Sequence, residues 1–231
     1  MIEVGKIAGI CLFAYLFGSI PFGYIITRAK GIEIQKIGSG NIGGTNVGRA
    51  LGFKYALWVG VMDAWKGAVP VATALYFIHS SWLGIGLAFF FCLLGAVLSI
   101  WLKIKVGSFR AGKGVATLIG GLLVLTGSSW LIMIGCWIAA FFFLVRRRVS
   151  AASLMLAAST LLLAPFIPVL LYIMPTTLLI VGLIWWAHRE NIKRMFKGEE
   201  PSLKLPSFFR KVPDDVIGLL VDKIKSLRKK H

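Results

Sequence analysis

The sequence has few charged residues for its length. Only 15% of the 231 residues are charged, whereas 58% are hydrophobic. A soluble domain of this size could not hide so much apolar surface from water. A lipid environment removes the difficulty, because outward-facing side chains are then also apolar. The shortage of charge therefore excludes an ordinary soluble domain and indicates an integral membrane protein.

Acidic residues are scarcer still. Before Arg189 the chain has 14 Lys and Arg but only Glu3, Glu33 and Asp63 as acids. A strongly basic balance is also typical of nucleic-acid-binding proteins. Here the basic residues stand in short loops between apolar runs, as the positive-inside rule requires of a membrane protein. The pattern predicts a membrane protein whose partners include lipids and do not include nucleic acid.

Cysteine is rare as well, and its placement excludes two kinds of site. Cys11, Cys92 and Cys136 all stand inside apolar segments, without CxxC or any other metal-ligand spacing. This arrangement argues against a disulfide framework and against a metal centre. We interpret all three as small buried hydrophobic residues.

The apolar runs have the length of membrane-spanning helices, which need roughly 20 residues. The segment 114–125 is apolar but short, so the count of crossings is six or seven. The candidate spans are Val4–Arg28, Tyr55–Ile78, Trp82–Trp101, Ser129–Val145, Ser150–Val169 and Leu170–Ala187.

The charges of the loops distinguish six membrane crossings from seven. Three loops carry Lys and Arg, at 28–54, 103–113 and 146–148, and three others carry none. Basic and non-basic loops alternate only if 114–125 is also a crossing. The predicted fold is therefore an all-α polytopic protein with seven transmembrane helices, its N-terminus outside and its C-terminus cytoplasmic.

The chain is expected to have two parts, a membrane domain over 1–200 and a basic tail over 201–231. A helix is predicted to begin near Pro213, because two acids follow it and apolar residues then recur at helical spacing. Its other side is rich in Lys and Arg, which suits an anionic membrane surface. A solvated basic tail is the alternative.

The first polar loop, 38–49, reads GSGNIGGTNVGR. It contains a GxGxxG pattern, but no buried strand precedes it, so a dinucleotide site is excluded. Glycines let backbone amides turn towards an anion, and neutral donors together with one guanidinium add to them. A flexible loop with helix caps is the alternative. The candidate ligands are Gly38, Ser39, Gly40, Asn41, Gly43, Thr45, Asn46 and Arg49.

The second polar loop has the GxxxxGK spacing of a nucleotide-binding loop over 107–113. Gly114 stands where a Ser or Thr would hold magnesium, so ATP hydrolysis is not expected. An apolar helix is still expected to begin at Gly112, Lys113 and Gly114. Its free backbone N–H groups and one ammonium suit a phosphate. A basic loop that only obeys topology is the alternative.

Two further groups of polar residues stand near apolar runs. Asp63 and Lys66 are three residues apart on one helical face and can pair, either in a functional site or as a clamp between helices. His188, Asn191 and Arg194 share a helical face where the last apolar run ends. This second group places an imidazole, an amide and a guanidinium at the membrane surface.

Together these stretches resemble the bacterial acyl-phosphate-dependent glycerol-3-phosphate acyltransferases (PlsY). Five motifs occur in the family's order between residues 18 and 200, which makes the resemblance specific. They are GSIPFG from Gly18, the loop GSGNIGGTNVGR, DAWKG from Asp63, AGKGVAT from Ala111 and HRENIKRMFKGEE from His188.

The resemblance implies a seven-helix enzyme of the cell (inner) membrane with its active site at the cytoplasmic face. Such an enzyme transfers an acyl group from acyl phosphate to the 1-hydroxyl of glycerol 3-phosphate, giving lysophosphatidic acid and phosphate. It implies that Ser39 and Arg49 are catalytic, that Lys113 holds phosphate, and that His188 and Asn191 are needed for activity. Glu200 matches the family's closing acid, which looks structural. Neither a metal nor a cofactor is implied.

The chain departs from the family pattern in three places. Ala96 follows Gly95 where the family usually has His, Gly44 stands where Ala is preferred, and the stretch around 105–110 is about four residues longer. These departures indicate a divergent member. The alternatives are a catalytically degenerate paralogue and a non-catalytic lipid-binding, anion-binding or transport protein, although the two halves show no inverted repeat.

The sequence leaves the general base open between two groups. His188 is one, because imidazole titrates near neutrality. A substrate phosphate, with its second pKa near ~6, is the other.

Overall fold

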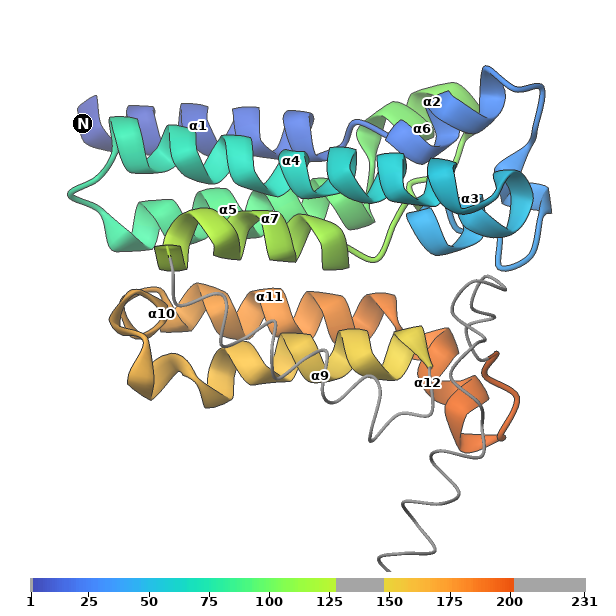
Figure 1. Ribbon diagram of the computed structural model, residues 1–231. Helices are drawn as coiled ribbons and strands as arrows, with labels where there is room; N and C mark the ends of the chain where they lie inside the picture. Colours follow the sequence, from blue (N-terminus) through green and yellow to red (C-terminus); the bar gives the residue numbers. More distant parts are fainter. Residues whose placement is uncertain (1, 128–147, 202–231) are drawn as a thin grey trace, which may run out of the picture. The chain divides into compact units, whose positions relative to one another are not determined.

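The computed structural model describes residues 2–127 and 148–201, and within these ranges the chain is helical (Figure 1). The β-type pairing found there is one antiparallel bridge, Leu98 with Arg110. The predicted all-α class is therefore confirmed for these ranges. The helices are α1 (Ile2–Gly18), α2 (Phe22–Arg28), η1 (Ile34–Lys36), α3 (Gly44–Leu51), α4 (Phe53–Phe77), α5 (Trp82–Val97), α6 (Ile100–Val106), α7 (Val115–Thr126), α9 (Val149–Leu162), η4 (Ala164–Phe166), α10 (Pro168–Tyr172), α11 (Met174–Ala187) and α12 (Arg189–Phe196).

The chain divides into two compact units, Met1–Glu200 and Pro201–His231. The amphipathic helix predicted near Pro213 lies outside the described residues, as do the predicted span Ser129–Val145 and Cys136.

One helical segment in the described ranges, Glu3–Arg28, is long and apolar enough to cross a membrane, and it comprises α1 and α2. The apolar helices α5, α7, α9 and α11 have 12 to 16 residues. The prediction of seven crossings with the N-terminus outside stays a prediction.

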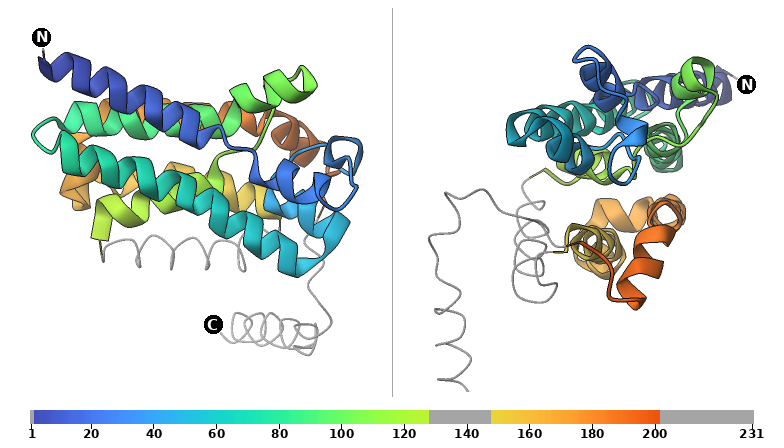
Figure 2. Two further views of the ribbon diagram at one scale, coloured as in Figure 1. Left: turned by 90° about the horizontal axis from the view of Figure 1, so that it is seen from above. Right: turned by 90° about the vertical axis from the view of Figure 1, so that its right-hand side faces the viewer.

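The first predicted span is interrupted, because α1 ends at Gly18 and α2 begins at Phe22 (Figure 2). Pro21 has no N–H to continue the helical ladder, and the break leaves the carbonyls of Ser19 and Ile20 without their donors four residues later. Side chains from other helices replace those donors. The Ser99 hydroxyl donates to the carbonyl of Ser19, and the Lys66 ammonium to that of Ile20 at 3.0 Å.

The helix predicted over 82–101 ends earlier, at Val97, because the backbone there turns to pair with a later loop. The N–H of Ser99 donates to the Phe109 carbonyl at 2.9 Å, and the N–H of Gly112 to the Ala96 carbonyl at 3.0 Å. This pairing fixes the second polar loop against the end of α5.

The two spans predicted over 150–187 also have different boundaries. The first helix of this region, α9, ends at Leu162, and α11 begins only at Met174. Proline explains the difference, since Pro165, Pro168 and Pro175 each stand at the start of a new helical segment.

The core lies where α4 meets α7 and where α1 meets α5, with α11 packed against α5 and α9. The α4–α7 crossing is close because glycines face backbone across it. A Cβ added at Gly67 would overlap the Thr117 carbonyl, and one at Gly120 would overlap that of Ala64. Small residues at such crossings are typical of helix pairs in membranes.

Candidate active site

Asn46 organises the first polar loop from inside. Its side chain is buried, and its amide donates to the carbonyls of Ile37 at 2.8 Å and Asn41 at 2.9 Å. Its Oδ1 accepts the N–H of Ser39 at 3.2 Å. Both N–H groups of the Asn46 amide are thus used by carbonyls of the loop and of the residues just before it, which gives Asn46 a positioning role.

The glycines of this loop allow the turns that Asn46 holds. Gly38 and Gly40 have φ of +54° and +69°, a region that side chains rarely adopt. The N–H of Gly43 donates to Asn41 Oδ1 at 2.7 Å, directly before α3 begins. The first polar loop therefore has a defined hydrogen-bonded conformation, and its role as a ligand site stays a prediction.

Several predicted ligands on this loop remain accessible. Ser39, Thr45 and Arg49 are exposed, the last two on α3. Arg49 forms no hydrogen bond or ion pair with the described parts of the chain. Its guanidinium is thus available to an anion.

Lys113 and its neighbouring glycines open α7 as the sequence predicts. Gly114 is the N-cap, with φ of +76°, and Gly112 is held by the backbone pairing to Ala96. The pKa of Lys113 is lowered to about 8, mainly by burial; Glu200 opposes the shift, and the nearby Arg194, Arg110 and Arg49 contribute to it. An ammonium in this setting is stabilised by an anion.

His188 lies at the junction of α11 and α12 with its side chain buried. Its Nδ1 is 2.8 Å from the Ile184 carbonyl, which can only accept, so Nδ1 carries a proton. Burial, followed by the charge of Lys113, lowers the pKa of His188 to about 4. The ring is therefore neutral at pH 7, with the lone pair on Nε2.

Asn191 and Arg194 share a face, as predicted, and both contact Glu200. The Asn191 amide donates to Glu200 Oε1 at 2.7 Å and to the Ser150 hydroxyl at 2.6 Å, and Arg194 Nε donates to Glu200 Oε2 at 2.9 Å. Ser150 also donates to Glu200. Burial alone would raise the pKa of Glu200, but these hydrogen bonds outweigh it and hold the pKa below its usual value. This network joins α12 to α9.

Asp63 and Lys66 pair as predicted, at 2.9 Å. The Lys66 ammonium also reaches the Ile20 carbonyl, and its side chain is almost fully buried. These contacts hold α4 against the break between α1 and α2, as the predicted clamp between helices would. That Lys66 binds substrate stays a prediction, because its buried ammonium is already engaged by Asp63 and Ile20.

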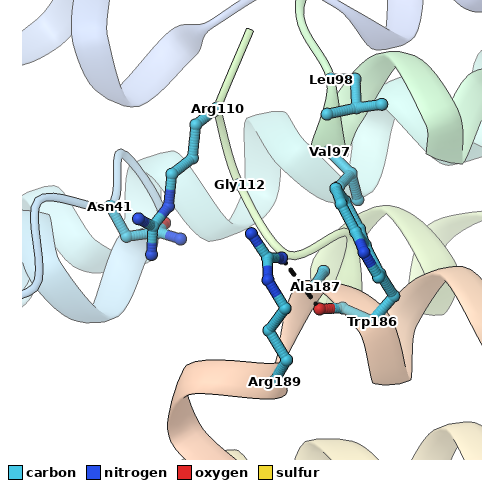
Figure 3. A pocket seen from close by; sticks show the side chains of 8 residues that line it. All are labelled: Asn41, Val97, Leu98, Arg110, Gly112, Trp186, Ala187 and Arg189. Carbon is cyan, nitrogen blue, oxygen red and sulfur yellow. Dashed lines mark hydrogen bonds between the residues drawn. The ribbon is translucent and has the colours of Figure 1, made fainter. Parts of the chain in front are cut away.

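A small pocket lies between the loops, α5 and the start of α12 (Figure 3). Asn41 and Gly112, both predicted ligands, line it together with Arg110 and Arg189. Arg189 stacks on Trp186, 4.3 Å from the ring centre, and donates to its carbonyl at 3.1 Å. Sequence reasoning missed both arginines as site residues, because Arg110 served only as a topology marker and Arg189 as a neighbour of His188.

The site carries unbalanced positive charge. Arg49, Arg110 and Arg194 each lie near enough to Lys113 to lower its pKa, and Glu200, the acid that also acts on Lys113, is already paired with Arg194. Within the described ranges no group of three His, Cys, Asp or Glu side chains is placed to hold a metal. The arrangement suits phosphate groups at the ends of apolar helices.

Comparison with known proteins agrees with this chemistry. Residues 8–198 match the family model for glycerol-3-phosphate acyltransferase. The chain belongs to this family. A glycerol-3-phosphate acyltransferase of Thermus thermophilus is 42% identical over 83% of this chain and 92% of its own, and that of Aquifex aeolicus is 37% identical over 82% and 95%.

Solved structures support the same assignment. The crystal structure of PlsY, an integral membrane glycerol 3-phosphate acyltransferase, in its glycerol 3-phosphate form matches with a TM-score of 0.78 at 34% identity, covering 86% of this chain and 96% of that one. Its lysophosphatidic acid form matches with a TM-score of 0.75. The helical fold is therefore that of an integral membrane protein.

One departure from the family pattern lies beside the site. Ala96 is buried directly behind Gly112 and accepts its N–H through the backbone carbonyl. Because this contact does not involve the side chain, an alanine at position 96 keeps the loop in place.

Proposed function

We propose that the chain transfers the acyl group of an acyl phosphate to the 1-hydroxyl of glycerol 3-phosphate, releasing phosphate and lysophosphatidic acid. The observation that carries the proposal is a group of cations that have no side-chain partner among the described residues. Arg110 lines the small pocket, Lys113 follows the lining residue Gly112, and the charges of Arg110 and Arg49 both act on Lys113. Acyl phosphate and glycerol 3-phosphate both carry negative charge, which these cations can neutralise. Membership of the acyltransferase family supplies the reaction class.

The chemistry requires positioning more than activation. An acyl phosphate is a mixed anhydride, so its carbonyl is already electrophilic and phosphate is a good leaving group. The hydroxyl oxygen forms a bond to the acyl carbon, the bond from that carbon to the phosphate oxygen breaks, and the hydroxyl proton passes to a phosphate. Loop amides and fixed cations lower the barrier by aligning both substrates and neutralising their charge.

The proton acceptor in this proposal is the substrate phosphate. The pKa of His188 is about 4, whereas the second pKa of a phosphate ester is near ~6, so the phosphate is the stronger base. His188 Nε2 can then accept a hydrogen bond, and this bond would orient a substrate hydroxyl or a protonated phosphate oxygen. Ser39 and Arg49, both accessible, are assigned to the substrates, with Arg49 holding a phosphate.

The proposed location is the cell (inner) membrane, with seven crossings and the site at the cytoplasmic face. The loops that carry the site are those rich in Lys and Arg, which favours the cytoplasmic side. Attaching a membrane-impermeant label to a cysteine introduced at Ser39 tests the orientation. Labelling of inverted but not right-side-out vesicles is expected, and the opposite result would place the site outside.

The reaction is tested by giving the purified protein acyl phosphate, with and without glycerol 3-phosphate. Phosphate release that requires glycerol 3-phosphate is expected. Glycerol 3-phosphate binding without release, from well-folded protein, would support a catalytically degenerate paralogue. Release independent of the acceptor would indicate a hydrolase.

A further inference from the structure

Helix α6 and the turn that follows it form an exposed segment of the chain. Leu102 is the only fully buried residue of the range 101–110, all of which the structure describes. The large apolar side chains of Trp101, Ile104 and Val106 are 42%, 67% and 37% exposed. The range includes the stretch that is longer than the family pattern. The exposed apolar surface therefore belongs to a part in which this chain departs from that pattern.

The same segment is positively charged and contains no acid. Lys103, Lys105 and Arg110 are exposed, and the sequence has no Asp or Glu between Asp63 and Glu190. Lys105 has no hydrogen-bond or ion-pair partner in the ranges 2–127 and 148–201. The positive charge of α6 is therefore not balanced by a neighbouring carboxylate of the described chain.

Neither water nor the hydrocarbon core of a membrane suits this combination of side chains. In water, Ile104 and Trp101 would leave apolar surface exposed, and in hydrocarbon the ammonium of Lys105 would lose its solvation. The boundary between the two satisfies both kinds of group. Apolar side chains there reach the acyl chains, a Trp ring lies at the headgroup level, and Lys extends its ammonium to the headgroups.

The position of α6 agrees with this depth. The indole N–H of Trp101 donates to the Leu16 carbonyl near the end of α1 at 3.0 Å. Leu16 is 13 residues from Glu3, about 20 Å along the helix, and α6 extends beyond the end of α1 (Figures 1 and 2). The hydrocarbon core is about 30 Å thick. Because Glu3 is acidic and exposed, it marks one boundary, which puts Lys103 and Lys105 near the other.

The backbone pairing that fixes the second polar loop also closes the base of α6. Leu98 and Arg110 form the antiparallel bridge, and both line the polar pocket. The Lys103 ammonium donates to the Gly107 carbonyl at 3.1 Å and lies 5.4 Å from the centre of the Phe109 ring. A contact that holds α6 therefore also restricts the backbone of Arg110.

We propose that α6 docks on anionic phospholipid headgroups at the membrane surface and that this contact steadies the loop over 98–112. The ligand is the lipid phosphate, which complements the charge of Lys103 and Lys105. Each basic residue near an anionic surface raises the affinity about fivefold, whereas a zwitterionic headgroup gives no such net attraction. The inference goes beyond the proposed function, because it assigns a lipid partner to a surface outside the site.

Hydrogen exchange of the wild-type protein in nanodiscs tests the contact where it occurs. Peptides covering 98–112 should exchange at least about threefold more slowly in discs of phosphatidylglycerol than in discs of phosphatidylcholine. Discs of mixed composition then give the phosphatidylglycerol fraction at which this protection is half-maximal. Equal exchange in the two kinds of disc would overturn the proposal.

Two single-charge variants show whether α6 is the surface responsible. Lys105→Gln breaks no side-chain contact of the described chain and should need about fivefold more phosphatidylglycerol for half-maximal protection. Lys36→Gln is the matched control, because it also removes an exposed lysine, but one that is paired with Glu33. It should stay within about twofold of the wild type.

Equal shifts in Lys105→Gln and Lys36→Gln would reduce the effect to net charge and overturn α6 as the docking surface. Neither measurement uses phosphate release. A protein without acyltransferase activity would therefore contradict the proposed function and leave this inference to be decided by hydrogen exchange.

Discussion

The side-chain amide of Asn191 donates a 2.7 Å hydrogen bond to the buried carboxylate of Glu200. Sequence resemblance presents Asn191 as a residue needed for activity, and the structure supplies a reason that does not require contact with substrate. Asn191 holds the acid that pairs with Arg194 and raises the pKa of Lys113. It is therefore a positioning residue in this account.

Replacing Asn191 with Asp should destabilise the protein. The change removes two hydrogen bonds and puts a second carboxylate beside Glu200, and disruption of buried polar networks of this kind costs about 1–3 kcal/mol. Thermal unfolding in detergent should show a lower Tm, with weaker phosphate binding. Lys193→Gln is the control on the same helix. Its ion pair with Glu190 is exposed, so its Tm should stay near that of the wild type.

Phosphate binding should weaken as the pH rises above about 8. The pKa of Lys113 is lowered to about 8 in the free protein, so the ammonium is charged below that pH and neutral above it. A bound anion raises this pKa, and binding therefore takes up a proton in that window. Titration with inorganic phosphate from pH 7 to 10 should show a rising Kd. Lys113→Arg should give a flatter profile, and a wild-type Kd independent of pH would contradict this role.

His188→Gln should keep turnover within about tenfold of the wild type. The Gln amide can still donate to the Ile184 carbonyl, and the account assigns proton removal to a substrate phosphate rather than to imidazole. Loss of a true general base lowers turnover by about 10²–10⁴-fold. Single-turnover rates for His188→Gln and His188→Ala distinguish the roles. A loss of that size in both variants would make His188 the base.

Gly38→Ala should abolish most activity, because the first loop would no longer close on Asn46. The residue has φ of +54°, and an added Cβ would lie 2.5 Å from Asn46 Oδ1. Gly31→Ala is a matched control with φ of +73° and open space around its Cβ. Both variants carry backbone strain of about 1–3 kcal/mol. Only Gly38→Ala should raise the KM for glycerol 3-phosphate, and an equal effect of both would point to strain alone.

Much of the fold could be predicted from apolar runs and proline. The breaks could not, since they depend on partners far along the chain. The interruption at Pro21 is stable because Ser99 and Lys66 supply donors to the freed carbonyls. The early end of α5 likewise depends on a loop that pairs with it a dozen residues later. Periodicity within one segment contains no information about such contacts.

The sequence predicts which loops form the site. It does not predict which of their residues face a ligand and which support the loop. Asn41 and Gly112 line one pocket, and Lys113 directly follows Gly112. Asn46 was indistinguishable in sequence from its exposed neighbours, and only its four hydrogen bonds show that it supports the loop. Arg110 could have been found by giving weight to its place two residues before Gly112.

Analysis of both reaction products shows whether this divergent chain is a working acyltransferase. Well-folded purified protein is given acyl phosphate and glycerol 3-phosphate, and the rates of phosphate release and lysophosphatidic acid formation are measured together. Equal rates are expected for the two products, because each transfer releases one phosphate and forms one lysophosphatidic acid. Absence of both products, while the protein still binds glycerol 3-phosphate, would contradict acyltransferase activity.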